Sequence, residues 1–176
     1  MTGIETVLLN TQRYLLRTLI TSFGSAIVVI LIGFWIMLRS MRLAVVALIP
    51  NVLPVVAVFG LMSWIGIPLD VGTAMVASIV LGLAVDDTIH TMVHYRELAA
   101  VHGSDEAIAR TLEATAPAYL LTGAILMLGF GTLTFSSFLP TARFGLLCAT
   151  SVGVAVLAEL FLIPVVTGAF FTGSRR

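Results

Sequence analysis

The feature that most constrains the fold of this chain is a series of apolar runs, each long enough to cross a lipid bilayer. A membrane-spanning helix needs about 20 apolar residues. Four runs carry almost no charged side chain: residues 19–38, 43–69, 114–142 and 144–174. A fifth run, residues 71–85, is shorter but continues into a less apolar segment. The sequence therefore predicts an all-α membrane protein, a polytopic bundle of five transmembrane helices.

The composition agrees with a membrane protein and excludes several other classes. Hydrophobic residues make up 59% of the 176 positions and charged residues 10%, whereas a soluble domain is about a quarter charged. The net charge is zero, so no nucleic-acid partner is expected. The single cysteine, Cys148, lies within a predicted span and is expected to be a small packing residue rather than part of a disulfide framework.

The chain divides into a preface of residues 1–18 and a transmembrane domain of residues 19–174. Leucines and arginines in the preface suit a short amphipathic helix that lies at the membrane interface. No cleavable signal peptide is evident at the N-terminus. The predicted spans cover about residues 20–38, 43–65, 71–95, 117–136 and 142–168.

Prolines, glycines and polar residues between the apolar runs predict where helices bend, begin and end. Pro50 and Pro54 predict a kink near the start of the second span. The sequence "GIPLD" at 66–70 predicts a tight turn, in which Asp70 caps the helix that follows. Residues 96–115 form a long polar stretch and predict an amphipathic helix on the cytoplasmic surface.

The arginines predict the orientation of the chain in the membrane. Three segments fall on one side by alternation and together carry six arginines: Arg39, Arg42, Arg96, Arg110, Arg175 and Arg176. The other side carries three. This asymmetry places the C-terminus in the cytoplasm and the N-terminus outside. A first span that starts outside, together with the odd number of spans, indicates a piece of a larger protein.

An acidic pair interrupts the third span, in the stretch "GLAVDDTIHTMVHYRE" at residues 82–97. A charged group deep in a bilayer costs several kcal/mol even on the more lenient scales. Adjacent carboxylates also disfavour each other's ionisation, so Asp86 and Asp87 are expected to titrate as a coupled unit. One member is expected to hold its proton near neutral pH, which makes the pair a predicted proton-loading site.

Two histidines extend the acidic pair into a predicted proton relay. Asp86, His90 and His94 recur at four-residue spacing and share one helix face. Imidazoles one turn apart can pass protons between a carboxylate and water. Glu159, the other intramembrane acid, is predicted to complete the relay or to pair with a histidine; alternatively it extends to the interface or bonds a hydroxyl.

Other interpretations of these residues stay open. The carboxylates can be structural groups bonded to hydroxyls such as those of Thr122 or Thr132, and His94 can be an interfacial residue. Asp86, His90 and His94 could also ligate a metal, although no further His or Cys cluster supports it, so no metal site is predicted. Small residues at positions such as Gly72, Gly82 and Gly123 predict close helix packing, either static or allowing the helices to slide.

Residues 39–97 resemble the C-terminal membrane half of resistance-nodulation-division permeases. The resemblance lies in several motifs together: the arginine turn "RSMR", the "PNVLP" kink, the "GIPLD" turn, and a glycine, Gly82, four residues before the acidic pair. The most similar branch contains lipid and hydrophobe exporters related to the mycobacterial MmpL proteins, the hopanoid exporters and Patched. Later segments, including "LFLIPVV", also fit, so the resemblance covers nearly the whole chain.

The resemblance implies an organisation and partners for the chain. Family members have twelve spans in two similar halves, each with a large extracytoplasmic porter domain, and this chain would be spans eight to twelve. The preface would be the tail of a porter domain. Implied partners are membrane lipids, a lipid or hydrophobic substrate, and the missing N-terminal half or a porter-domain subunit; a homo-oligomer is also possible in this family. The implied location is the bacterial inner membrane.

The family's mechanism supplies the functional expectation. Acidic residues of its central spans couple inward proton flow to export, a role that falls here on Asp86 and Asp87. The expected function is a proton-coupled transporter module, driven by the proton motive force without another cofactor. The alternative is a non-transporting bundle that senses sterols or lipids, or a scaffold. The chain is not expected to be an enzyme, since it lacks a nucleophile motif, and an intramembrane metalloenzyme remains a third hypothesis.

Overall fold

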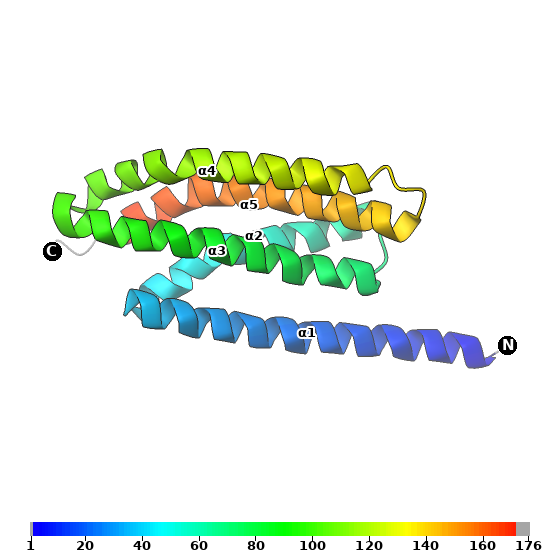
Figure 1. Cartoon of the computed structure of the whole chain (residues 1–176). Helices are drawn as coiled ribbons and strands as arrows, with labels where there is room; N and C mark the ends of the chain where they lie inside the picture. Colours follow the sequence, from blue (N-terminus) through cyan, green and yellow to red (C-terminus); the bar gives the residue numbers. More distant parts are fainter. Residues whose placement is uncertain (1, 172–176) are drawn as a thin grey trace.

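The computed structural model describes residues 2–171, and these residues form five long helices and no strand (Figure 1). Each helix contains a stretch long and apolar enough to cross a membrane. The prediction of an all-helical bundle with five spans is therefore confirmed. The helices are α1 (Thr2–Leu38), α2 (Met41–Ile65), α3 (Val71–His102), α4 (Ser104–Leu133) and α5 (Leu139–Phe171).

Helices α2 to α5 pack into one bundle, and α1 runs along its edge. Figure 1 shows α4 and α5 side by side, with α3 next to them and α2 crossing behind α3. Helix α1 contacts α2 and α3, and its first turns extend beyond the rest of the bundle. The start of α1 and the end of α5 lie at opposite ends of the bundle. Much of α1 is consequently exposed, as expected for a helix with lipid or protein still to contact.

Helix α1 differs from the predicted division into an interfacial preface and a separate span. It runs without a break from Thr2 to Leu38. The polarity of the chain changes near residue 18, but no proline stops the helix there, so the backbone hydrogen bonds continue. The preface is therefore the first part of a long helix, and its position at a membrane interface stays a prediction.

The polar segment 96–115 also differs from the prediction, because it does not form a surface helix of its own. Helix α3 continues to His102 and α4 begins at Ser104. Good helix formers follow Arg96, so α3 extends beyond its apolar part. The break comes at Gly103, whose φ of 83° suits glycine far better than a residue with a side chain.

The turn before α3 follows the sequence closely. Helix α2 ends at Ile65, and Gly66 adopts a left-handed conformation with φ 74°, the usual helix terminator. Asp70 then caps α3: its Oδ1 accepts a hydrogen bond of 2.8 Å from the Thr73 amide. The Asp70 amide donates in return to Thr73 Oγ1, also at 2.8 Å. This reciprocal capping box confirms the predicted cap.

The capping box gives a direct test of the fold. Asp70→Ala is expected to cost about 1 kcal/mol, because the Thr73 amide loses its acceptor. Hydrogen exchange of the first turn of α3, measured in lipid, should accelerate accordingly. Ser40→Ala is the matched control, since Ser40 precedes α2 but makes no side-chain capping bond. Equal acceleration in the first turns of α2 and α3 would contradict the assignment.

The two prolines of α2 do not end that helix. Pro50 and Pro54 lie inside it and are buried in the bundle. Each removes one backbone donor, so two carbonyls of the preceding turns lack their usual helical partner. Asn51 lies between the prolines and is fully buried. A polar side chain thus lies inside the bundle at the point where the prolines remove backbone hydrogen bonds of α2.

The packed core lies where α2, α3 and α5 meet. Cys148 on α5 is fully buried there and acts as a packing residue, as predicted. A second apolar cluster joins the end of α1 to α2 and α3 around Phe34 and Met92. The guanidinium of Arg96 on α3 also donates to the carbonyl of Met37 on α1. Together these contacts hold α3 between α1 and α5, which places its acidic pair next to the core.

Candidate functional site

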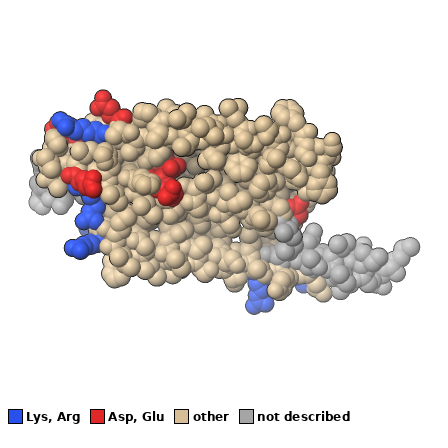
Figure 2. All heavy atoms as spheres, in the orientation of Figure 1, with Lys and Arg blue, Asp and Glu red and all other residues tan. Residues whose placement is uncertain are grey.

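The acidic pair lies on α3, between the two ends of the bundle. Figure 2 shows carboxylate atoms within the otherwise uncharged side of the molecule, while most charged side chains gather near its ends. Consecutive helical residues point about 100° apart, so the two carboxylates meet different surroundings. The Asp86 side chain is 77% exposed, whereas Asp87 is partly buried. The two acids are therefore not equivalent.

Asp86 belongs to an exposed stripe along α3. His90 Nε2 lies 3.9 Å from Asp86 Oδ1, and the His90 side chain is 75% exposed. One turn further, His94 Nδ1 lies 4.0 Å from Glu97 Oε2. The predicted sharing of one face by Asp86, His90 and His94 is thus present, but this face points away from the bundle. The histidines do not lead through the core.

Asp87 faces the other helices. Its backbone carbonyl accepts hydrogen bonds from Thr91 Oγ1 at 2.9 Å and from the Tyr119 hydroxyl of α4 at 3.1 Å. The Thr91 and Tyr119 hydroxyls also contact each other, so one of them can donate to the other in place of the Asp87 carbonyl. Asp87 lines a cavity of about 20 Å³ between α3, α4 and α5 that also involves Thr122. That volume admits about one water molecule, and Asp87 and Thr122 are the polar residues of a mostly apolar lining.

Glu159 on α5 is almost completely buried, with 2% of its surface exposed. Its Oε1 accepts a hydrogen bond of 2.5 Å from Thr88 Oγ1. Thr88 in turn accepts one of 2.9 Å from Asn51 Nδ2, which also donates to the Ala47 carbonyl at 2.7 Å. Of the alternatives that the sequence left open for Glu159, the structure has the bond to a neighbouring hydroxyl.

The structure therefore separates the five predicted relay residues into two groups. Asp87 and Glu159 face the inside of the bundle and lie close enough to interact electrostatically. Asp86, His90 and His94 lie on or near the outer face. In the described part of the chain, no three His, Cys, Asp or Glu side chains come together as a metal site requires. No link between the histidines and Glu159 is present among these residues either.

Sequence reasoning missed two members of the inner group. Asn51 was noted only as the residue between two prolines, and Thr88 only as part of the motif. The signal was available: a carboxamide in a charge-free span needs a buried partner. The suggested hydroxyl partners behave differently, because Thr122 and Thr132 donate to carbonyls of their own helix.

The three glycines predicted to pack helices closely occupy different environments. A Cβ atom on Gly123 would overlap the Val156 side chain of α5, so this glycine allows α4 and α5 to approach. A Cβ atom on Gly72 would meet only the nearby Asp70 carboxylate, at 3.3 Å. Gly82 is exposed and has no atom of another helix within 4 Å of its Cβ position. Contrary to expectation, Gly82 packs against no other helix among the residues that the structure describes.

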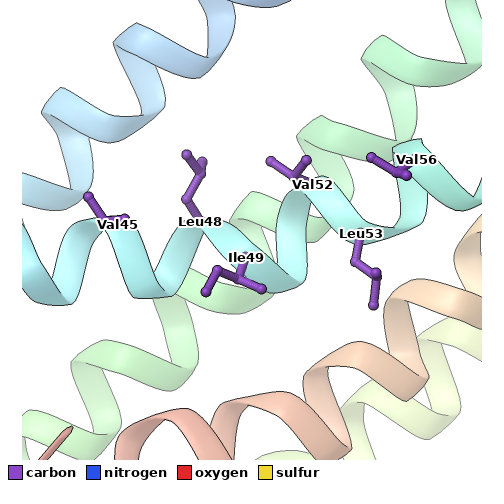
Figure 3. Close-up of a pocket in the computed structure, with 6 residues that line it drawn as sticks. All are labelled: Val45, Leu48, Ile49, Val52, Leu53 and Val56. Atoms are coloured by element: carbon purple, nitrogen blue, oxygen red, sulfur yellow. The ribbon is translucent and has the colours of Figure 1, made fainter.

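A larger hollow lies on α2 and contains no polar side chain. It has a volume of about 380 Å³ and is lined by Val45, Leu48, Ile49, Val52, Leu53 and Val56. Figure 3 shows that all six side chains project from α2, with α1 on one side and α5 on the other. No group there can hold or move a proton. The hollow suits an apolar molecule, and the ionisable residues lie elsewhere.

Comparison with known proteins identifies the family. Residues 15–171 match the family described as Patched, Patched SSD. The chain belongs to the Patched family. It is also 32% identical over 136 residues to the membrane protein MJ1562 of Methanocaldococcus jannaschii, an alignment that covers 77% of this chain and 35% of that relative. The chain thus spans about a third of the length of MJ1562.

Membership of the Patched family confirms the resemblance seen in the sequence and makes the chain a multi-span membrane domain. The relative is archaeal, so it lends no support to a bacterial inner membrane in particular. That location, with the N-terminus outside and the C-terminus in the cytoplasm, stays a prediction. The match does not assign a substrate.

Proposed function

We propose that this Patched-family domain is the proton-coupled module of a larger membrane permease that exports lipids or other hydrophobic compounds. The observation that carries the proposal is the placement of Asp87. It is an acid in the middle of a span, partly buried, beside a second buried acid and a cavity large enough for water. A carboxylate in such a place has a functional role by default in membrane proteins.

The surroundings of Asp87 suggest how its protonation would move helices. Its backbone carbonyl accepts a hydrogen bond from Tyr119, so α3 and α4 are joined at the residue that lines the cavity. A charged Asp87 favours a hydrated cavity, and a neutral one favours closer packing of α3 against α4 and α5. Protonation would thus shift the population between two helix packings, and the movement would reach a porter domain attached elsewhere.

The exposed stripe of α3 indicates a further partner. An acid and an imidazole such as Asp86 and His90 are costly when they face lipid, and one turn earlier Gly82 leaves room for another helix. The stripe places an acid and an imidazole one turn apart, so an identical stripe can set each acid against an imidazole. We propose that a second copy of this chain covers it, in the position that the other half takes in two-half permeases.

The proton-loading role can be tested by infrared titration of the purified protein in lipid. We expect a protonated-carboxyl band that titrates between about pH 5 and 8. Asp87→Asn should remove this band, and Asp86→Asn should shift it, because the charge next to Asp87 is lost. Glu113→Gln, which changes an exposed acid on α4, is the control and should leave the band unchanged. No titrating band in this range would contradict the proposal.

A lipid-binding bundle without transport is the second candidate. The apolar hollow on α2 favours it, since its volume and aliphatic lining suit part of a lipid chain (Figure 3). This candidate predicts photocrosslinking of a lipid probe to Val52 that does not change with pH or with Asp87→Asn. Crosslinking that follows the protonation of Asp87 would instead connect the hollow to the transporter cycle.

A further inference from the structure

Two buried oxygen atoms in the inner cluster have no hydrogen-bond donor. They are Asn51 Oδ1 on α2 and Glu159 Oε2 on α5. The second polar atom of each side chain, Asn51 Nδ2 and Glu159 Oε1, is hydrogen-bonded to the Thr88 hydroxyl. Both side chains are at least 98% buried, and an unsatisfied polar atom in such a place is costly. The cluster therefore lacks a donor near these two acceptors.

The orientation of the Asn51 amide is determined by its neighbours. The Ala47 carbonyl can only accept, so the group that bonds it must be the NH₂ of Asn51. The second hydrogen of that NH₂ goes to Thr88 Oγ1. Turning the amide over would bring two acceptors together at Ala47. Oδ1 is therefore the free end of Asn51, and it needs a hydrogen from elsewhere.

The charge balance around Glu159 points to the missing hydrogen. Thr88 already uses its hydroxyl hydrogen in the bond to Glu159 Oε1, and among the described residues no arginine or lysine forms an ion pair with Glu159. A lone carboxylate buried in this way is strongly disfavoured. One proton on Oε2 removes the charge and also creates the donor that Asn51 Oδ1 lacks. A single proton thus satisfies both unpaired atoms.

We propose that Glu159, Thr88 and Asn51 form a second proton-binding site, in which the Glu159 carboxyl keeps its proton on Oε2 and donates it to Asn51 Oδ1, directly or through one buried water. Glu159 binds the proton, and Asn51 and Thr88 are positioning residues. The inference rests on the proposed function, which it extends from one proton site to two, with the second site inside the bundle.

The ionisable groups around Glu159 connect the two sites. Asp87 on α3 and Tyr119 on α4 both interact with it electrostatically. Helix α2, the third helix packed against α5, carries no ionisable side chain beyond Arg42 near its start. A negative charge on Asp87 therefore disfavours a second charge on Glu159, so the two acids release their protons one after the other.

The cluster also gives this proton a mechanical consequence. Its hydrogen bonds join α2, α3 and α5, which are the helices that form the core. When Glu159 loses its proton, the donor to Asn51 disappears and both oxygen atoms lack a donor again. Helix α2 is then released from α5 at the position of its two prolines. We expect the protonated form to be the tightly packed state of the bundle.

The test is difference infrared spectroscopy of the chain in lipid at pH 7. Wild type minus Glu159→Gln should show a protonated-carboxyl band, because glutamine keeps both bonds and lacks only the carboxyl group. Asn51→Leu should shift that band to higher frequency with unchanged amplitude, since the O–H loses its acceptor. Thr150→Val on α5 is the matched control, because its hydroxyl bonds only carbonyls of its own helix and it does not line the Asp87 cavity. It should leave the band in place.

Several outcomes would overturn the proposal. If Glu159→Gln removes no protonated-carboxyl band, Glu159 is ionised at pH 7. A band that appears only when sodium is replaced by a bulky organic cation would mean that the cluster binds sodium. If Asn51→Leu does not fold, the frequency of the wild-type band still tests the proposal. A frequency typical of a carboxyl group without a hydrogen-bond acceptor would exclude donation from Glu159 to Asn51.

The same spectra separate this proposal from the proposed function. A titrating band removed by Asp87→Asn, with none removed by Glu159→Gln, would leave the transporter module standing and reject the second site. A band removed by Glu159→Gln alone would support the inner site and reject Asp87 as the loading group. Loss of neither band would reject both.

Discussion

Gly145→Ala is expected to lower the stability of the bundle by about 3 kcal/mol, at the upper end of what overpacking usually costs. Gly145 lies on α5 where this helix meets the end of α4. A Cβ atom there would come within 2.6 Å of both the Phe130 carbonyl oxygen and Leu133 Cβ, and within 3.0 Å of the Thr134 amide nitrogen. Two of these are backbone atoms, so α4 and α5 would have to move apart as whole helices.

Reversible unfolding in bicelles, followed by a steric-trap or denaturant titration, would measure this effect. Gly129→Ala is the matched control, since Gly129 lies in α4 and its Cβ position has no neighbour within 4 Å. It should change the stability by less than about 0.5 kcal/mol, as substitutions without contacts usually do. A similar loss in both variants would contradict the close approach of α4 and α5 at Gly145.

Gly82→Leu is expected to weaken self-association of the chain in lipid by roughly tenfold or more, which corresponds to about 1.4 kcal/mol. In the described part of the chain no atom of another helix lies within 4 Å of the Gly82 Cβ position, so the first carbon of a leucine side chain meets no clash there. In the proposed dimer the same position lets two α3 helices approach, which brings the Asp86–His90 pairs of both copies together. A leucine there would separate the helices and leave Asp86 and His90 of both copies facing lipid.

Energy transfer between labelled chains, measured while the lipid is progressively diluted, gives the dimer affinity. Gly60→Leu on α2 is the control, because this glycine is also exposed and without neighbours but lies on another helix. It should leave the affinity unchanged. A wild-type chain that stays monomeric at every dilution would overturn the dimer, and the α3 stripe would then require a different protein to cover it.

Much of the fold could be predicted because the bilayer imposes simple length rules. A run of about 20 apolar residues implies a spanning helix, so the number and order of the helices followed from the positions of the charges. The turn at Gly66 and the cap at Asp70 could also be predicted, because each depends only on residues that are neighbours in the sequence. The ends of α1, α3 and α4 were misplaced, because helical hydrogen bonding continues past the apolar core wherever no residue stops it.

The candidate site was predictable only in part. Asp86 and Asp87 are conspicuous, because carboxylates are rare in apolar segments. Their separate environments, one exposed and one facing a cavity, depend on which side of α3 the other helices cover. The prediction that the histidines share a face with Asp86 was correct as helical geometry. It could not show that this face points outward, away from Glu159.

By itself, the sequence determined that this protein is a helical membrane domain, where its helices lie, and that acids occupy the third span, because hydropathy and local backbone chemistry act along the chain. Only the tertiary structure decided that Asn51, Thr88 and Glu159 meet. These residues are 37 and 71 positions apart along the chain, and a bond over such a distance depends on how helices rotate and cross. That is set by the packing of the whole bundle, including the close contact at Gly145.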